Sequence, residues 1–404
     1  MSNIKSIFDW KVALLVSGCR IGIHTEFPSA ISLKKIHLYA HSNEKIDHPI
    51  PDDLLIGDHT IVRIRYRSDS PFILENFGEG YQVRYEKTDQ CIPVRLVNRP
   101  GFSGCTVAKL PISSICSFLG NDLLGITPSN YCFYFQTKQQ CRFCEILPTF
   151  KSDVEFPKTF KSLDIIENSI IQAMENEERL RFIAITTGNI HSYDETVDYF
   201  IEIGQRLQKH PIFTKAEQVL ATLMPPEDFS KIPILREKGF TKIYFPLEVF
   251  NPSHFSVVCP GKADFGYDRI LKALECAVEV FGVGNVYTNF VYGIQSLDSS
   301  LNPASYDPVA ENTLCLKAVK EILARKVIPA FTLYHYAGYN SIGKLELNLD
   351  ATNAFFREWG SLVFDAEIIP AEQEAVLFSP LSLSNTLFND GFQLAKKKEK
   401  TIWI

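Results

Sequence analysis

Short runs of apolar residues, separated by Pro, Gly, Asp and Asn, dominate the first part of the chain. These runs either alternate with polar residues or are continuously aliphatic, and few of them have the periodicity of a helix. Such a pattern predicts β-strands that are joined by turns. We therefore expect a β-rich N-terminal domain over residues 1–120, with strands at residues 31–39, 60–66, 81–85 and 92–96.

Beyond residue 121 the pattern changes to an alternation of strand-like and helix-like segments. The predicted strands lie at residues 131–136, 180–186, 217–223, 242–247, 286–292 and 327–334. The predicted helices lie at residues 162–178, 194–208, 226–238, 265–281 and 307–325. Six β/α units in series imply parallel strands with right-handed crossovers, so we expect a partial (β/α)6 TIM-like barrel over residues 121–340.

The remaining residues, 341–404, are predicted to form a short C-terminal helical extension. Its helix candidates lie at residues 351–362 and 385–398. The fold class that we expect is therefore α/β, with the barrel between a β-rich domain and this extension. In such a barrel the chemistry takes place at the C-terminal ends of the strands.

Composition narrows the classes of function. The chain has 404 residues, of which 46% are hydrophobic, and this is enough for a sizeable core. A net charge of -6 provides no basic face and disfavours nucleic acid as a partner. The apolar run at residues 12–16 is too short to span a bilayer and lacks a cleavage pattern. We therefore expect no signal peptide and no membrane segment, and a cytoplasmic location.

Ten cysteines are too few for a disulfide scaffold in a chain of this size, so the thiols are expected to be free, buried or metal-bound. Cys132, Cys141 and Cys144 lie close together, and the last two form a C-x-x-C pair. A tight turn points both sulfurs of such a pair to one side, as a shared metal ion or cluster requires. Three thiolates leave one coordination position open for an incoming ligand.

The other cysteines are widely spaced, and most of them are expected to be buried small hydrophobic residues: Cys19, Cys91, Cys105, Cys116, Cys259, Cys276 and Cys315. The three-cysteine loop has an alternative interpretation of its own. A C-x-x-C pair with a third cysteine is also typical of structural zinc sites. A zinc-stabilised binding module without catalysis is therefore one alternative.

A barrel whose first strand leads into a three-cysteine loop resembles the radical S-adenosylmethionine (radical SAM) superfamily, in particular its biotin-synthase-like members. There, three cysteines hold a [4Fe-4S] cluster, and S-adenosylmethionine chelates the fourth iron. One electron from the cluster cleaves S-adenosylmethionine to methionine and a 5′-deoxyadenosyl radical, which takes a hydrogen atom from the substrate. The resemblance implies that Cys132, Cys141 and Cys144 hold the cluster, in a C-x8-C-x2-C loop instead of the common C-x3-C-x2-C spacing.

The resemblance extends to residues that would bind S-adenosylmethionine. Phe143 matches the aromatic residue that the superfamily places near the adenine. Thr187, Gly188 and Asn189 follow the second predicted strand and resemble the segment whose backbone accepts hydrogen bonds from the methionine amino group. Gly188 also has a physical use, because glycine lets the backbone approach a ligand closely.

Glu248 follows the fourth predicted strand, where the superfamily has an acid that binds ribose or orients the substrate. An ionised group among aliphatic and aromatic residues needs a ligand or a partner, and a structural ion pair with Lys262 is the alternative. Gly293 and Gln295 resemble the segment after the fifth strand that flanks the adenine. His335 lies near a predicted strand end, where substrate would lie. Glu248 and His335 are therefore the candidate catalytic residues.

These features predict a radical SAM enzyme that takes hydrogen from a small-molecule substrate in cofactor or natural-product biosynthesis. The resemblance implies a [4Fe-4S] cluster and S-adenosylmethionine as cofactors, and a reductase or a flavodoxin- or ferredoxin-type electron donor. The long first gap of the cysteine loop is shared with Elongator-type tRNA-modifying members, so modification of tRNA or of a protein is a second alternative. The acidic charge balance argues against RNA.

Overall fold

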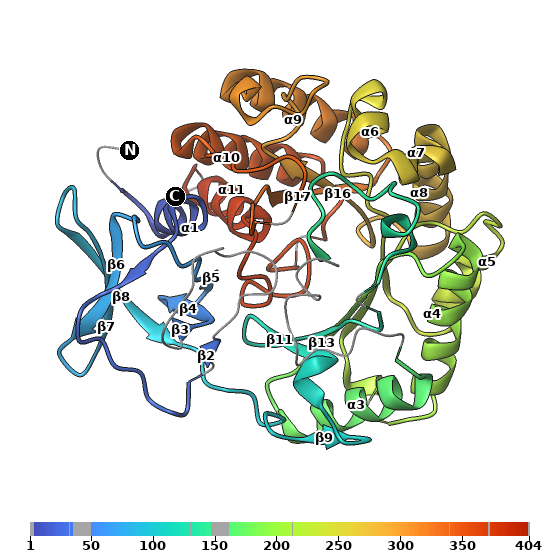
Figure 1. The fold of residues 1–404 in the computed structure, drawn as a ribbon, viewed down its shortest axis with the longest axis horizontal. Coiled ribbons are helices and arrows are strands. Elements are labelled where there is room, and N and C mark those ends of the chain that lie inside the picture. Colours follow the sequence, from blue (N-terminus) through green and yellow to red (C-terminus); the bar gives the residue numbers. More distant parts are fainter. Residues whose placement is uncertain are drawn as a thin grey trace.

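The structure is a computed structural model, in which residues 4–31, 33–34, 50–129, 131–146, 161–211, 213–338, 340–370 and 372–402 are described. Two sheets dominate it, one of seven strands and one of six. The seven-stranded sheet curves with helices on its outer side, and the six-stranded sheet lies beside its open side (Figure 1). No helix within the described ranges is long and apolar enough to cross a bilayer.

Six strands of the larger sheet run parallel and neighbour one another in chain order. They are β12 (Leu123–Ile126), β13 (Phe182–Thr186), β14 (Gln218–Thr222), β15 (Lys242–Tyr244), β16 (Val286–Tyr292) and β17 (Ile328–Leu333). Strand β11 (Cys116–Leu119) pairs with β12 in the antiparallel direction. Every residue of β16 is buried, as expected for a strand that is covered on both faces. The predicted partial (β/α)6 barrel is confirmed.

Helices form the outer layer of the barrel and pack apolar faces against the sheet (Figure 1). They are α3 (Leu163–Asn176), α4 (Tyr193–Leu207), α5 (Lys231–Glu237), α6 (Pro252–Val258), α7 (Pro260–Phe265), α8 (Tyr267–Phe281) and α9 (Pro308–Ala324). Helix α4 begins with a capping box, in which the Ser192 hydroxyl accepts from the amide of Glu195 and the Glu195 carboxylate accepts from the amide of Ser192.

The N-terminal part is β-rich, as the alternating runs predicted. The strands of its main sheet, in spatial order, are β1 (Arg20–Ile21), β6 (Phe72–Phe77), β7 (Gly80–Tyr85), β8 (Gln90–Leu96), β4 (Asp53–Ile56) and β5 (Thr60–Arg63). Two short pairs accompany it, β2 (Leu33–Lys34) with β3 (Ile50–Pro51), and β9 (Thr106–Val107) with β10 (Leu110–Pro111). Residues 32 and 35–39 of the strand predicted at 31–39 lie outside the described residues.

Helix α1 (Ile7–Ser17) precedes the N-terminal sheet in the chain, and the sequence pattern did not reveal it. Residues 8–15 of α1 are all buried, so this helix has no polar stripe and no helical alternation of apolar and polar positions. Two further helices follow the barrel, α10 (Leu349–Asp365) and α11 (Phe388–Ile402), and both were predicted. They pack against each other, and α10 also contacts α1 and α9.

The prediction of a strand at residues 131–136 was wrong. The first barrel strand is β12, and the aromatic run that followed it forms the single-turn 3-10 helix η2 (Phe133–Phe135) instead. Pro128 lies between them, and a proline cannot donate a hydrogen bond to a strand ladder. The further 3-10 turns are η1 (Ile112–Ser114), η3 (Phe213–Lys215) and η4 (Pro303–Ser305).

Residues 379–386, which we call the closing segment, connect the two ends of the curved sheet. In the turn between β11 and β12, the Asp122 carboxylate accepts hydrogen bonds from the hydroxyls of Ser379 and Ser382. At the other end, Thr386 forms a β-bridge with Thr332 of β17. The open side of the barrel is therefore spanned by chain that lies far away in sequence.

The closing segment also joins the barrel to the N-terminal sheet. The amide of Arg63, in edge strand β5, donates to the carbonyl of Ser384 at 2.9 Å. The ammonium of Lys11, in α1, contacts the carboxylate of Asp390 at 2.6 Å, just beyond the segment. The two sheets are thus held in one framework. The division into domains at residues 120 and 340 stays a prediction, and β11, which precedes the first boundary, pairs within the barrel sheet.

Candidate active site

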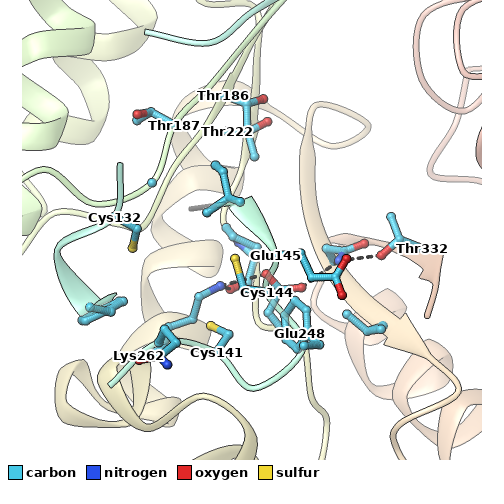
Figure 2. A pocket seen from close by; sticks show the side chains of 18 of the residues that line it. Cys132, Cys141, Cys144, Glu145, Thr186, Thr187, Thr222, Glu248, Lys262 and Thr332 are labelled. Atoms are coloured by element: carbon cyan, nitrogen blue, oxygen red, sulfur yellow. Dashed lines mark hydrogen bonds and ion pairs between the residues drawn. The ribbon is translucent and has the colours of Figure 1, made fainter. Parts of the chain in front are cut away.

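A cavity of about 470 Å³ lies at the C-terminal ends of the parallel strands. This is a volume at which ligand pockets are common. Strand ends contribute Thr186, Thr222, Tyr244 and Thr332 to its lining. Figure 2 shows three of these threonines around the space that the cysteine loop borders. The site therefore occupies the edge of the sheet where the barrel topology places chemistry.

The structure brings Cys132, Cys141 and Cys144 to this one cavity (Figure 2). A backbone hydrogen bond of 3.0 Å from the amide of Cys144 to the carbonyl of Cys141 closes the turn between the last two. The long gap after Cys132 is held from both sides. The amide of Phe133 donates to Asn189 at 2.8 Å, and the amide of Gly261 donates to Gln139 at 3.0 Å.

Gly188 is the contact point between strand β13 and the first cysteine. A Cβ atom at this position would lie 2.7 Å from the Cβ of Cys132 and 2.7 Å from the carbonyl oxygen of Tyr131. Only glycine lets the two segments approach this closely. Thr187 and Asn189, on either side, also line the cavity, so the predicted set 187–189 lies together beside Cys132.

The three thiols differ in their surroundings. Burial raises the pKa of Cys132 and of Cys144. A hydrogen bond from the thiol of Cys259 lowers the pKa of Cys141, against the opposing effect of burial, and the charge of Lys262 lowers it further. Thiolates rather than thiols bind metals, and Cys141 is therefore the thiol best disposed to ionise in this loop.

Glu248 and Lys262 face each other at the cavity wall. The Lys262 ammonium donates to the Glu248 carboxylate at 2.9 Å and to the carbonyl of Pro246 at 3.0 Å. The second carboxylate oxygen of Glu248 accepts from the amide of Asn289 at 2.7 Å. Burial opposes the charge on Lys262, but the attraction of Glu248 and of Cys141 raises its pKa. The ion pair that the sequence offered as an alternative is present, and it borders the cavity.

The backbone at Glu248 is unusual. Its φ is +70°, in the left-handed region, which residues other than glycine rarely adopt. The conformation is held by its neighbours, because the amide of Glu248 donates to Asn289 at 2.6 Å and the side chain of Gln295 donates to the carbonyl of Glu248 at 2.9 Å. Backbone strain that is held in place in this way clusters at functional sites.

The remaining predicted residues divide into two groups. Phe143 and His335 line the cavity, whereas Gly293 and Gln295 do not belong to its lining. The amide of Gly293 donates to the carboxylate of Glu311 at 2.5 Å, and Gln295 hydrogen-bonds the loop after β15. Binding of S-adenosylmethionine by Gly293 and Gln295 stays a prediction. In the structure, the hydrogen bonds of both residues support the loops that follow β15 and β16.

Sequence reasoning missed three residues that the structure places at the site. Glu145, directly after the last cysteine, accepts hydrogen bonds from the amide of Ala337 at 2.9 and 3.0 Å and so ties the cysteine loop to the segment after β17. Cys259 contacts Cys141. Arg65 reaches the cavity from the N-terminal sheet. The adjacency of Glu145 to Cys144 was a usable signal, but only the fold brings Cys259 and Arg65 here.

The donor set suits an iron–sulfur cluster. Soft thiolates are the ligands that such clusters take, and each thiolate binds a different iron. Within the described part of the chain, no three His, Cys, Asp or Glu side chains are grouped tightly enough to hold a single metal ion. The three thiols border the same cavity.

Comparisons with known proteins give similar sequences and structures. No family model matches the chain. It is 24% identical over 237 residues to the bacteriochlorophyllide c C-7(1)-hydroxylase of Chlorobaculum limnaeum, and the match covers 55% of each protein. The chain therefore spans about half the length of the curated relative that it matches.

Two solved structures are also similar. One is the FeFe-hydrogenase maturase HydG from Carboxydothermus hydrogenoformans, with 15% identity, a TM-score of 0.41 and coverage of 62% of this chain and 52% of that one. The other is a radical SAM methyltransferase from Sphaerobacter thermophilus, with 12% identity, a TM-score of 0.42 and coverage of 77% and 80%. The second of these structures is named as a radical SAM enzyme, the superfamily that the cysteine loop resembles.

Proposed function

We propose that this chain is a radical SAM enzyme that removes a hydrogen atom from a small-molecule substrate. One observation carries the proposal. The thiols of Cys132, Cys141 and Cys144 share a cavity with Gly188 and with the carboxylate of Glu248, at the C-terminal edge of a parallel α/β sheet. The similarity to a relative that is named for a small-molecule substrate supports a small molecule over tRNA or a protein.

In this proposal, the three thiols hold the cluster, and the segment 187–189 and Phe143 lie against S-adenosylmethionine. When bound, the cluster and S-adenosylmethionine supply one-electron reduction and the radical that takes hydrogen from the substrate. An electron donor of the flavodoxin or ferredoxin type, or a reductase, provides the electron.

The protein's own residues position and shield the reactants. Lys262 and Asn289 hold both oxygens of the Glu248 carboxylate, which leaves its remaining lone pairs for hydroxyl groups such as those of a ribose. The side chain of Thr187 is itself fixed, because it donates to the carbonyl of Ser129 at 3.3 Å. Aromatic and aliphatic residues such as Phe143, Leu223 and Val291 line the cavity, and an apolar lining protects reactive intermediates from water.

The test is anaerobic reconstitution with iron and sulfide. We expect about four irons per chain, the absorbance and EPR signals of a [4Fe-4S] cluster, and release of 5′-deoxyadenosine with S-adenosylmethionine and a strong reductant. Single Cys→Ala variants at 132, 141 and 144 should lose the cluster. The variant Cys91→Ala is the matched control, because that thiol is exposed on β8 of the N-terminal sheet and does not belong to the cavity lining. Retention of the cluster in all three loop variants would overturn the proposal.

Elemental analysis of protein purified without oxygen separates this function from a zinc-stabilised module. About one zinc per chain and no iron favours the module. Modification of tRNA is tested by filter binding at low salt, where phosphate contacts are strongest. Tight retention of tRNA under these conditions would favour that alternative.

A further inference from the structure

Three arginines occupy alternate positions from the last residue of strand β5 onward, at 63, 65 and 67, and they differ in their partners. Arg63 forms a two-point ion pair with Asp53, at 2.9 and 3.2 Å. Arg67 forms one with Asp69, at 3.0 Å for both contacts. Arg65 lies between them, and among the described residues no carboxylate pairs with it. The middle arginine is therefore the exception in this row.

Arg65 is buried, with 7% of its surface exposed. One of its terminal nitrogens donates to the carbonyl of Leu15, in the last turn of α1, at 2.7 Å. Its Nε atom is buried and has no hydrogen-bond partner within the described residues. A neutral carbonyl does not balance a full positive charge, and an uncompensated buried ion is strongly unfavourable.

The guanidinium nevertheless stays charged. Burial and the nearby charge of Arg63 lower the pKa of Arg65 to about 10, which is still well above neutral pH. Positions at which a protein keeps such a charge are expected to meet an oppositely charged ligand.

Arg65 lines the cavity of the cysteine loop. The other cation of the lining, Lys262, is paired with Glu248, and Glu145 accepts hydrogen bonds from backbone amides after β17. Within the described lining, Arg65 is therefore the cation that has no carboxylate partner. A ligand that fills this cavity meets this positive charge at the side of the N-terminal sheet.

His335 lies in the same lining. Burial, followed by the charges of Arg65 and Arg67, lowers the pKa of His335 well below its ordinary value. Its imidazole is therefore neutral at physiological pH and adds a hydrogen-bonding group without a second charge.

We propose that Arg65 binds an oxyanion, a carboxylate or phosphate group, on the substrate of this cavity. The planar fork of a guanidinium matches two oxygens of such a group. The inference rests on the proposed function and states the chemical class of its substrate, which is an acid whose anionic group faces the N-terminal sheet. S-adenosylmethionine also carries a carboxylate, so the experiment must distinguish the two sources.

The experiment uses cluster-loaded protein and anionic probes at constant ionic strength. Benzoate and inorganic phosphate represent the two oxyanions, and benzamide is the neutral counterpart of benzoate. We expect one of the anions to raise the melting temperature of the wild-type protein, and benzamide to leave it unchanged. In Arg65→Met the affinity for that anion should fall at least about tenfold. Arg67→Met is the control, and it should retain the affinity.

Three results would overturn the inference. Neither anion binds the wild-type protein, or Arg65→Met binds them as tightly as the wild type does, or Arg65→Met weakens the binding of S-adenosylmethionine itself. The last result would assign Arg65 to the cofactor. Equilibrium dialysis with S-adenosylmethionine measures this directly. We expect unchanged affinity for S-adenosylmethionine in the variant.

Thermal stability distinguishes a ligand-binding role of Arg65 from a structural role. If the charge of Arg65 serves a ligand, Arg65→Met should melt within about 2 °C of the wild-type protein, because it removes an uncompensated buried charge. Arg63→Met is the matched contrast. It removes the two-point ion pair of the buried Asp53 carboxylate, and it should melt about 5 °C lower or more. Equal losses in the two variants would count against a ligand role for Arg65.

The test of anion binding by Arg65 can fail or succeed independently of the test of the proposed function. Iron content and 5′-deoxyadenosine test the cluster, whereas the anion-dependent shift in melting temperature tests Arg65. If Arg65→Met fails to fold, Arg65→Lys replaces it. That variant keeps the charge but loses the fork, and it should bind the anion with intermediate affinity. Binding by Arg65→Lys that equals that of the wild type at every anion concentration would contradict two-point recognition.

Discussion

The ammonium of Lys262 lies 2.9 Å from the carboxylate of Glu248, and the two side chains are 8% and 11% exposed. Glu248 follows strand β15, whereas Lys262 belongs to helix α7, so the pair also joins two elements at the cavity wall. A buried pair of this kind is most sensitive to the loss of one member, because the other charge then remains without compensation.

Removing only the positive member should destabilise the protein. We expect Lys262→Met to lower the free energy of unfolding by about 3 to 5 kcal/mol, because it leaves the Glu248 carboxylate buried and unpaired. The double variant with Glu248→Gln should lose less than the sum of the two single variants, as coupled neighbours do. Urea denaturation of the four proteins measures the coupling. Simple additivity would show that the pair contributes little.

The left-handed backbone at Glu248 makes a separate prediction. The variants Glu248→Ala and Glu248→Gly remove the same carboxylate, but only glycine adopts a φ of +70° without strain. Glu248→Gly should therefore be about 1 kcal/mol more stable than Glu248→Ala. Thermal denaturation of the two variants side by side provides the comparison, and a more stable alanine variant would show that the strain is absent in solution.

Cys259 should behave as a neighbour of the cluster site and not as a ligand. Its thiol donates to Cys141, but it lies at the start of α7 and is outside the cavity lining. We expect Cys259→Ala to retain the iron content of the wild-type protein, whereas Cys141→Ala loses it. Iron and sulfide analysis after identical reconstitution measures both. Loss of iron in Cys259→Ala would make Cys259 part of the ligand set.

Glu177 predicts how stability depends on pH. Its carboxylate, at the end of α3, accepts from the amide of Gly101 at 2.8 Å and from the Arg179 guanidinium at 2.7 and 2.8 Å. Burial opposes the charge, but these hydrogen bonds outweigh it and lower the pKa of Glu177 from 4.5 to about 2. A lowered carboxyl pKa stabilises the fold above the unfolded value and ceases to do so as the pH falls towards the folded value.

We therefore expect Glu177→Gln to cost about 2 kcal/mol of unfolding free energy at pH 7, and the difference to disappear between about pH 4.5 and pH 2. Urea denaturation of the cluster-free proteins across this range measures it. Glu217→Gln is the control, because the pair between Glu217 and Arg181 is half exposed and should contribute less than about 1 kcal/mol. A pH-independent difference between Glu177→Gln and the wild type would contradict the assignment.

The closing segment is tested at Gly120. This glycine has a φ of +61°, and a Cβ atom there would lie 2.0 Å from the carbonyl oxygen of Leu381. Gly78 has nearly the same φ, +58°, with nothing within 4 Å of a Cβ atom. Gly78→Ala should therefore cost about 1 kcal/mol, from the backbone alone, and Gly120→Ala clearly more. Thermal melting of the two variants separates the clash from the conformation, and equal losses would place Leu381 elsewhere.

Periodicity predicted most of the barrel, because its helices are amphipathic and its buried strands are continuous apolar runs. The strand β16 and the helix α8 illustrate this, and both lie close to their predicted residues. The errors arise where apolar residues are not confined to one face, so that their spacing does not distinguish a helix from a strand. Helix α1 is buried along residues 8–15, and the aromatic run after Tyr131 favours a strand by propensity but follows Pro128 and leaves the sheet.

The candidate site was predictable where its members are close in sequence or follow a strand. The cysteine loop, Gly188 and Glu248 were found in this way, and they share the cavity. Arg65 could not be found, because its significance depends on which of three alternating arginines lacks an acid. That is a property of the assembled fold, and no local pattern records it.

The closing segment determines when the open side of the barrel is closed during folding. Asp122 and Ser382 are 260 residues apart, and within the described residues it is the closing segment, which comes after both strands in the chain, that bridges β12 and β17. Forming so distant a contact requires the entropy of a very long loop to be overcome first, which places it late among folding events. Until the polypeptide beyond β17 docks, the curved sheet stays open on one side. The cavity that the cysteines line is then accessible from that side to the iron and sulfide that cluster assembly needs.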